Sequence, residues 1–359
     1  MTATTQRRTD APPPASGGGA PGRSRGLHAA LTVVRLGPVL LLGLIVAIMA
    51  ALSPVFLTAV NLGNVGLEAT VVAILALGQL LVILTAGIDL SVGSVIAMSS
   101  VIAALWIRDL DLVSGWLVIP SMILVGGLAG GVNGTLFVKG KLPHPFLPTL
   151  AMLMVARGVA LIVSEGQPIT GMPESVTALG SERIGQVPLS VLLVAGLAVV
   201  VGVILKRITW GQWIYAIGGN REAARRVGVP VDRVLISVYV FSGMCAGTAA
   251  IVVSGQTNSA YPTAGNLMEL SAIAAVIIGG ASFFGGRGTV IGTLVGALIL
   301  GVIQNGLNLL NVQSSWQYVA LGTAVVIAVE MDVLRSRLET RLRTVRTEES
   351  EEPEVSRHE

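Results

Sequence analysis

The fold of this chain is decided by residues 67–107, which read LEATVVAILALGQLLVILTAGIDLSVGSVIAMSSVIAALWI. Only Gly87, Asp89 and Gly93 interrupt this apolar stretch, which is long enough for two helices that each cross about 30 Å of hydrocarbon. The whole chain has 359 residues, of which 53% are hydrophobic and only 12% are charged. Because soluble domains carry about 25% charged residues, this composition predicts a membrane protein. Long apolar runs also argue against a β-barrel, whose strands alternate in short segments.

Further apolar runs follow along the chain, and each predicts a membrane-spanning helix. We therefore expect an all-α polytopic membrane protein with about ten transmembrane helices. The boundary between the second and the third helix is placed near Gly87. The ten predicted spans are residues 37–57, 67–86, 91–107, 117–138, 145–163, 188–205, 234–254, 268–283, 289–309 and 316–333.

The basic residues between the predicted spans indicate the orientation. If both termini are cytoplasmic, only Arg108 and Arg183 of the 23 Lys and Arg residues fall in outside segments, and Arg157 lies within a span. All the others are then inside. Since cytoplasmic loops carry an excess of Lys and Arg, both termini are predicted to be cytoplasmic.

The amino-acid composition of both chain ends predicts segments outside the membrane domain. Residues 1–28 are rich in Pro, Gly and Arg and are expected to form a disordered cytoplasmic tail. Residues 336–359 are basic and then acidic, and they form a charged cytoplasmic tail, which leaves 29–335 as the membrane domain. One cysteine and three widely separated histidines exclude an intramolecular disulfide and predict no metal site.

The longest inside loop, residues 206–233, contains a predicted short helix. Asn220 is a suitable N-cap for a helix over 221–227, with an acidic residue early and two arginines late. Gly228 and Pro230 then end the helix. Such a helix is suited either to a partner protein or to anionic lipid.

Several segments resemble a known family. Glu222, Ala223 and Ala224, with Gly228 four positions after the last of them, resemble the loop by which permeases of ATP-binding-cassette importers contact their ATPases. Five segments in order are similar to ribose-type sugar permeases, and the similarity extends over residues 37–332. They are 85–94 (TAGIDLSVGS), 216–225 (AIGGNREAAR), 261–265 (YPTAG), 269–276 (ELSAIAAV) and 292–301 (GTLVGALILG).

The resemblance implies that 29–335 is a permease domain that carries a monosaccharide, a ribose-like pentose or a hexose, across a bacterial plasma membrane. It implies a second permease subunit, ATPase subunits at the cytoplasmic face and an extracytoplasmic sugar-binding protein. The loop 206–233 would then couple to the ATPase. The residues expected to carry this coupling are Asn220, Arg221, Glu222, Ala223, Ala224, Arg225 and Gly228.

The chain contains no phosphate-binding G-x-x-x-x-G-K-[ST] motif, because Gly140-Lys141 is followed by Leu142. It is therefore expected to be a transport subunit and not an enzyme, with no cofactor of its own and with ATP and Mg²⁺ on the partner ATPase. Two alternatives remain open. One is a permease of the same superfamily for nucleosides, branched-chain amino acids or a signalling sugar, and the other is an ion-coupled secondary transporter.

Three charged residues within or beside the spans are candidates for the translocation pathway, since each costs about 2.5–3.5 kcal/mol in a membrane. They are Asp89, Arg157 and Glu269. Each also has a structural alternative. Asp89 is placed to cap the third span, Arg157 to pair with a glutamate, and Glu269 to favour a helix N-terminus.

Four neutral polar residues suit an uncharged, hydroxyl-rich substrate because they offer both donors and acceptors. They are Gln79, Asn133, Asn305 and Asn308. Asn305 and Asn308 are three apart and are expected on one helix face. The alternative is hydrogen bonding from helix to helix.

Glycine is frequent within the spans. The pairs Gly126/Gly130 and Gly292/Gly296 have the spacing that lets helix backbones approach closely. A short internal sequence similarity also relates residues 87–93 (GIDLSVG) to residues 280–286 (GASFFGG).

Overall fold

The computed structural model describes residues 21–313, with side chains from residue 36, and isolated positions between 315 and 333. Most of the predicted span 316–333, residues 1–20 and the tail 336–359 lie outside the described residues. One expectation is corrected at the N-terminus. The first helix begins at Pro21, inside the predicted disordered segment 1–28, because proline suits the first turn of a helix.

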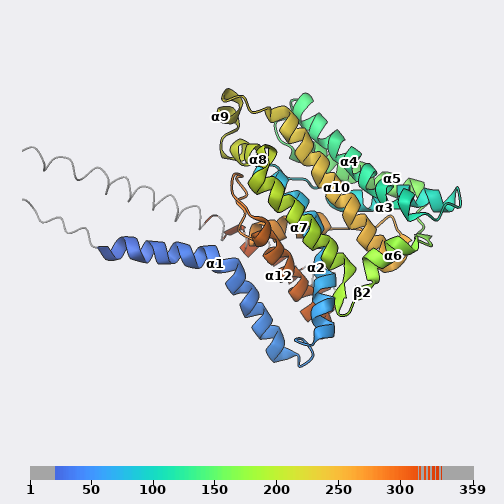
Figure 1. Cartoon of the computed structure of the whole chain (residues 1–359), viewed down its shortest axis with the longest axis horizontal. Coiled ribbons are helices and arrows are strands. Elements are labelled where there is room, and N and C mark those ends of the chain that lie inside the picture. Colours follow the sequence, from blue (N-terminus) through green and yellow to red (C-terminus); the bar gives the residue numbers. More distant parts are fainter. Residues whose placement is uncertain are drawn as a thin grey trace, which may run out of the picture.

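The described chain is mainly helical (Figure 1). In chain order its elements are α1 (Pro21–Leu52), α2 (Ala59–Leu84), α3 (Val92–Arg108), α4 (Gly115–Lys139), α5 (Phe146–Val163), β1 (Ile169–Thr170), α6 (Glu174–Ser181), β2 (Arg183–Ile184), β3 (Val187–Pro188), α7 (Leu189–Arg207), α8 (Thr209–Gly219), α9 (Arg221–Arg226), α10 (Val231–Thr257), β4 (Ser259–Ala260), α11 (Met268–Ile278) and α12 (Val290–Leu309).

Six of these helices, α2, α4, α5, α7, α10 and α12, are long and apolar enough to cross a membrane. Residues 36–52 of α1, together with α3 and α11, form shorter apolar helices. All of the predicted spans except 316–333 therefore contain an apolar helix. The run 268–283 is only partly helical, because α11 ends at Ile278 after 11 residues, a rise of about 16 Å.

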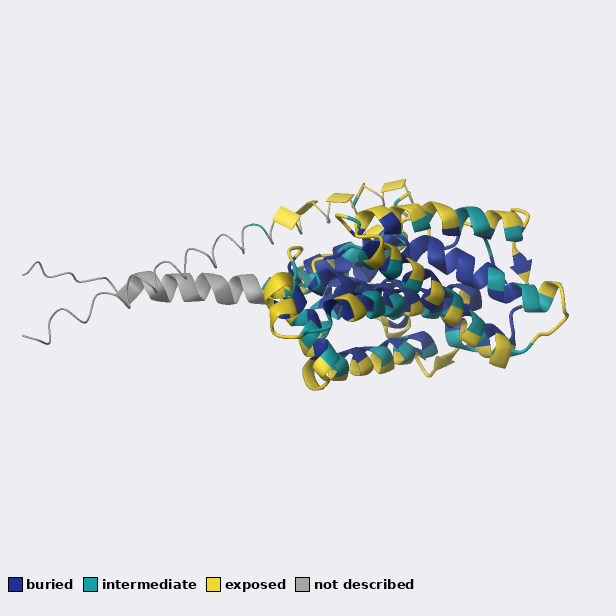
Figure 2. Ribbon diagram, turned by 90° about the horizontal axis from the view of Figure 1, so that it is seen from above, coloured by how far each residue is buried: buried dark blue, intermediate teal, exposed yellow. Residues whose placement is uncertain are grey.

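Helix α2 lies at the centre of the bundle, and 89% of its most apolar 18-residue window is buried. The same windows of α4, α5 and α7 are only 22–28% buried, which places these helices at the periphery. Figure 2 shows the same division, with buried residues inside and exposed ones on the outer helix faces. The apolar outer faces of the peripheral helices are what a bilayer would cover.

Helices α4 and α10 pack closely through glycines. A Cβ atom at Gly126 would meet the backbone of Gly243, one at Gly130 would meet Tyr239 O, and one at Gly134 would meet the Cα of Ile236. In lipid, helix association depends on close van der Waals packing, which these glycines allow. The small-residue spacing therefore serves tight packing in α4.

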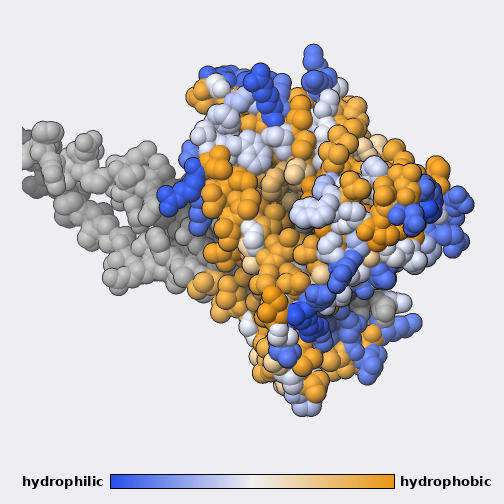
Figure 3. Space-filling view, turned by 45° about the vertical axis from the view of Figure 1, so that its right-hand side comes forward, coloured by the Kyte–Doolittle hydropathy of each residue, from blue (hydrophilic) through white to orange (hydrophobic). Residues whose placement is uncertain are grey.

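The two ends of the bundle differ. Helices α8 and α9 lie at the end opposite α6 and β2 (Figure 1). At the α6 end, β1 pairs antiparallel with β4, with Ile169 opposite Ala260, and β2 pairs with β3. Figure 3 shows an apolar belt on the face in view, with hydrophilic side chains gathered towards its ends. This is the surface of a protein that crosses a bilayer.

The close packing of α4 against α10 can be tested with two valine substitutions. Gly130→Val is expected to lower the yield and the thermal stability of detergent-purified protein, because its Cβ would overlap Tyr239 O. Gly202→Val in α7 is the matched control, since a Cβ there meets no atom within 4 Å. Equal stability of the two variants, measured by fluorescence-detected size exclusion after heating, would contradict this packing.

Candidate functional site

The segment between α2 and α3 is an extended stretch inside the bundle. Residues 87–91 are not helical, as the break near Gly87 predicts. The side-chain amide of Gln79 accepts a hydrogen bond from Asp89 N at 3.1 Å and donates to Asp89 O at 3.2 Å, in the amide orientation that satisfies both groups. Because the chain bonds to a residue of α2, it turns back along that helix. Non-helical backbone inside a membrane is tolerated when protein groups satisfy it in this way.

The carboxylate of Asp89 is the centre of a buried polar cluster. Its Oδ1 accepts from Ser91 N at 3.0 Å and from Ser91 Oγ at 2.6 Å, while Oδ2 accepts from Ser242 Oγ at 2.9 Å. Asn133 Nδ2 donates to Ser91 Oγ at 2.9 Å. Three predicted pathway residues, Gln79, Asp89 and Asn133, thus meet in one cluster that joins α2, α3, α4 and α10. Asp89 fixes the turn before α3 and does not cap an N–H within that helix.

Two buried polar atoms beside this cluster have no partner in the described part of the chain, Asn133 Oδ1 and Tyr239 Oη. A Cβ at Gly87 would lie 2.7 Å from Tyr239 Oη, so the tyrosine reaches the extended segment. Unpaired buried groups of this kind need water or another ligand. Tyr239 and Ser242 were not predicted from the sequence, although their spacing of three places them on one face of α10.

A second cluster lies around Arg157. Its guanidinium donates to Pro262 O at 2.6 Å and to Ala264 O at 2.9 Å, which ties α5 to the segment before α11. Within the described residues it therefore binds backbone carbonyls and makes no ion pair. Glu269 is 7% exposed and lies against α3, because a Cβ at Gly93 would overlap Glu269 Oε2.

Residues 280–286 pack against the end of α2, directly before the similar segment 87–93. Gly286 N donates to Leu84 O at 2.9 Å, at the end of α2. A Cβ at Gly285 would lie 2.9 Å from the Cβ of Ala86, and one at Gly218 in α8 would overlap Leu84 O. The end of α2, the end of α8 and the connection between α11 and α12 therefore pack backbone to backbone.

Asn305 and Asn308 of α12 differ in burial. Asn305 is buried and exchanges two hydrogen bonds with Asn61 of α2, at 3.0 and 3.1 Å, whereas Asn308 is exposed. Their spacing of three keeps both residues on one side of α12, but only Asn305 is buried. Asn305 takes the alternative role of a helix-to-helix hydrogen bond.

The elbow, which we define as residues 206–233, contains the predicted short helix as α9, together with α8, which was not predicted. Asn220 Oδ1 accepts from Ala223 N at 2.9 Å and caps α9, which ends at Arg226. Gly228 has a φ of 86°, a conformation that favours glycine. Ala224 is buried, and the Arg221 guanidinium lies 5.3 Å from the centre of the Phe137 ring. The elbow is thereby attached to α4.

The outer surface of α9 is exposed in the part of the chain that the structure describes. Arg225 pairs with Asp232 at 2.7 Å, and Arg226 pairs with Glu222 at 3.4 Å. These pairs are exposed and contribute little to stability. Next to them Val227 is 80% exposed, an apolar residue at the tip of a charged surface. This combination is typical of a small docking surface.

The apolar belt, the buried polar interior and the exposed elbow define a multi-pass helical membrane protein. The chain belongs to the family described as the permease component of branched-chain amino acid transport systems, which matches residues 61–329. As a permease component it is a transport subunit and not an enzyme.

Curated relatives match most of the chain. The ribose import permease protein RbsC of Haemophilus influenzae is 38% identical over 80% of this chain and 90% of the relative. The same protein of Bacillus subtilis is 39% identical, covering 84% and 94%. The D-allose transport system permease protein AlsC of Escherichia coli is 36% identical, covering 84% and 93%. No solved structure matches the chain.

The Asp89 cluster can be tested by two substitutions at one position. Asp89→Leu is expected to destabilise the protein by about 1–3 kcal/mol for each hydroxyl or N–H left without an acceptor. Asp89→Asn should cost less, because its oxygen can accept from Ser91 while its nitrogen donates to Ser242. The measurement is the thermal midpoint in detergent.

Asp109→Leu is the control for these substitutions. Asp109 follows α3 and its exposed carboxylate is hydrogen-bonded by Arg108, which lowers the pKa of Asp109. Its loss should leave the thermal midpoint close to that of the wild type, because surface substitutions have small effects. If Asp89→Leu were as stable as Asp109→Leu, the buried cluster would not hold the extended segment.

Proposed function

We propose that the chain is the permease subunit of an ATP-driven importer for a monosaccharide, a ribose-like pentose or a hexose. The observation that carries this proposal is the 36–39% identity, over 80–84% of the chain, to permeases named for ribose and D-allose. Hydroxyl and amide groups in the interior also suit a neutral, hydroxyl-rich substrate.

The topology that goes with this function has ten spans, both termini in the cytoplasm and the protein in the plasma membrane of a bacterium. The elbow and the segments around Lys139 and Arg287 then face the cytoplasm, and α6 faces outward. This assignment is supported by the concentration of Lys and Arg at one end of the bundle.

The partners in this proposal occupy the two ends. An ATPase subunit, which holds ATP and Mg²⁺, docks on the elbow through Glu222, Arg226 and Val227. An extracytoplasmic binding protein delivers sugar at the α6 end, and a second permease subunit completes the pathway. The backbone contacts of Gly218 with Leu84 and Gly286 connect the elbow to the end of α2 and to the segment before α12.

Two alternatives are less well supported. An amino acid substrate needs charged partners, yet Arg157 is held by carbonyl groups and Asp89 by Ser91 and Ser242. An ion-coupled transporter needs an accessible titratable or cation-binding group near the midplane. Asp89 is 1% exposed and fully hydrogen-bonded, so it is poorly placed for that role.

The function is tested by reconstitution into vesicles. With the co-purifying ATPase, internal ATP and external binding protein, labelled ribose should accumulate inside against its gradient. The chain alone should accumulate none, with or without a proton or sodium gradient. Concentrative uptake by the chain alone under an ion gradient would overturn the proposal in favour of a secondary transporter.

The docking surface is tested by Glu222→Arg and Val227→Asp. Each should reduce the ATPase that co-purifies per permease by about tenfold, as for an interface residue worth about 1.4 kcal/mol. Gly228 is less suitable for this test because its positive φ makes any substitution strained. Glu174→Arg, an equal charge reversal on α6, is the control and should retain the ATPase. Full co-purification with both elbow variants would exclude this surface.

A further inference from the structure

A groove runs along the outside of α4 and α10 and plays no part in the proposed transport route. It has a volume of about 790 Å³ and is open to the surroundings. Thr135 is the only uncharged hydrogen-bonding side chain among the lining residues, and none of them is charged. The lining residues are Ile119, Pro120, Ile123, Leu124, Gly127, Leu128, Gly131, Val132, Thr135, Leu136, Val240 and Met244.

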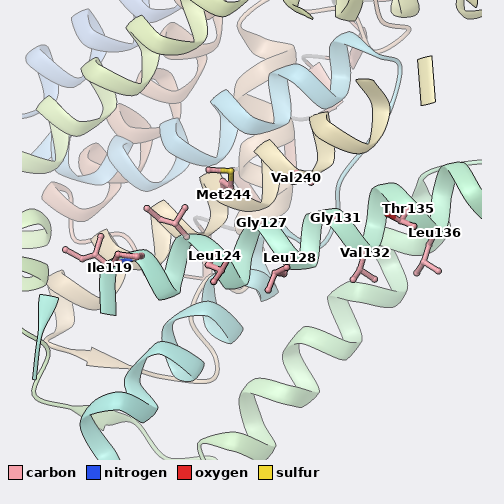
Figure 4. A pocket seen from close by; sticks show the side chains of 12 residues that line it. Ile119, Leu124, Gly127, Leu128, Gly131, Val132, Thr135, Leu136, Val240 and Met244 are labelled. Atoms are coloured by element: carbon pink, nitrogen blue, oxygen red, sulfur yellow. The ribbon is translucent and has the colours of Figure 1, made fainter. Parts of the chain in front are cut away.

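Glycines form the floor of the groove (Figure 4). A Cβ at Gly127 would lie 3.1 Å from Met244 Cγ, and one at Gly131 would lie 3.5 Å from Val240 Cγ2. Leu124 and Leu128 project beside them and are 62% and 61% exposed. A hydrocarbon chain, which is thinner than a helix about 10 Å wide, fits over these glycines between the projecting leucines.

The part of the groove from Gly127 to Leu136 has the length of one leaflet. From Gly127 to Leu136 the axis of α4 rises by about 14 Å. Half of a hydrocarbon core of about 30 Å is about 15 Å. An acyl chain of the inner leaflet would therefore fill the part of the groove between these two residues.

Two basic residues stand at the inner end of the groove. Lys139 follows Leu136 by three positions and lies on the same side of α4, and Arg233 precedes Val240 by two turns on α10. Both are exposed, and neither forms an ion pair within the part of the chain that the structure describes. The neighbouring Asp232 is bound by Arg225 at 2.7 Å. Positive charge at this end is thus available to an anion.

The two basic residues belong to the same end of the helix pair. Because Gly134 packs on Ile236, and Gly130 on Tyr239, the helices run antiparallel, so the end of α4 meets the start of α10. Lys139 and Arg233 therefore lie beyond the last groove residues of each helix. Basic groups between helices on the cytoplasmic side bind anionic headgroups.

We propose that this groove binds an anionic phospholipid of the inner leaflet, with an acyl chain over Gly127 and Gly131 and the phosphate at Lys139 and Arg233. The proposal uses the orientation given under the proposed function, which places both basic residues at the cytoplasmic leaflet. It does not depend on the substrate. Lipid retention is measured without transport, so it can fail while sugar import stands.

The test uses the full chain, purified with its co-purifying subunits, delipidated and incubated with equal amounts of phosphatidylglycerol and phosphatidylcholine. Native mass spectrometry then measures the retained lipid. The wild type should retain phosphatidylglycerol preferentially. Lys139→Ala and Arg233→Ala should each reduce that preference about fivefold. Gly131→Leu should reduce retention of both lipids, because its side chain fills the groove.

Matched controls keep the test specific. Arg183→Ala removes an exposed basic residue at the opposite end of the bundle, outside the elbow. Gly196→Leu adds the same side chain to α7, where a Cβ meets no atom within 4 Å. Both should behave as the wild type. No preference in the wild type, or equal losses in these controls, would overturn the proposal.

A second copy of the chain in the groove would also overturn it. Cys245 is buried, so Leu128→Cys adds an exposed thiol inside the groove. If lipid occupies the groove, oxidation in native membranes should form no disulfide-linked dimer of this variant. A disulfide-linked dimer through residue 128 would instead identify the groove as an interface between copies.

Discussion

The structure depends on the need to satisfy every peptide group that leaves a helix inside the membrane, where no water is available to replace a lost hydrogen bond. The extended segment after α2 meets this need through Gln79, which bonds both the N–H and the C=O of Asp89. The Asp89 carboxylate then holds Ser91 and Ser242, and Asn133 holds Ser91. One buried set of polar groups thereby fixes how four helices meet, and it is costly to disturb because each group would be left unpaired.

Close backbone packing at glycines is the second interaction that holds the helices of the bundle together. Lipid and leucine are equally apolar, so helices in a bilayer gain little by burying leucine and associate where their backbones come close. Gly126, Gly130 and Gly134 do this between α4 and α10, and Gly218 does it between the elbow and the end of α2. Under the proposed function, the contact at Gly218 would connect the ATPase-docking elbow to the end of α2 through backbone atoms.

Sequence segments shared with sugar permeases are distant along the chain and adjacent in space. Gly93 of the first segment lies against Gly265 and Glu269 of the third and fourth, and Gly218 of the second lies against Leu84. Gly296 of the fifth packs on Ala275. Their resemblance to the family is therefore a property of one packed region. Arg157, outside all five, secures that region by binding the carbonyls of Pro262 and Ala264.

The sequence by itself determined the class of protein, the positions of the apolar helices, the break near Gly87 and the capped helix after Asn220, because these follow from local composition, helix propensity and capping. Tertiary structure alone decided the partners of the polar residues. Gln79, Asp89 and Asn133 meet in one cluster, whereas Asn305 pairs with Asn61 and leaves Asn308 exposed. The early start of α1 at Pro21 and the short α11 also escaped prediction. A hydrogen bond between residues far apart in sequence depends on which helix faces turn inward, and hydrophobic periodicity carries little of that information when the membrane-spanning helices are apolar all round.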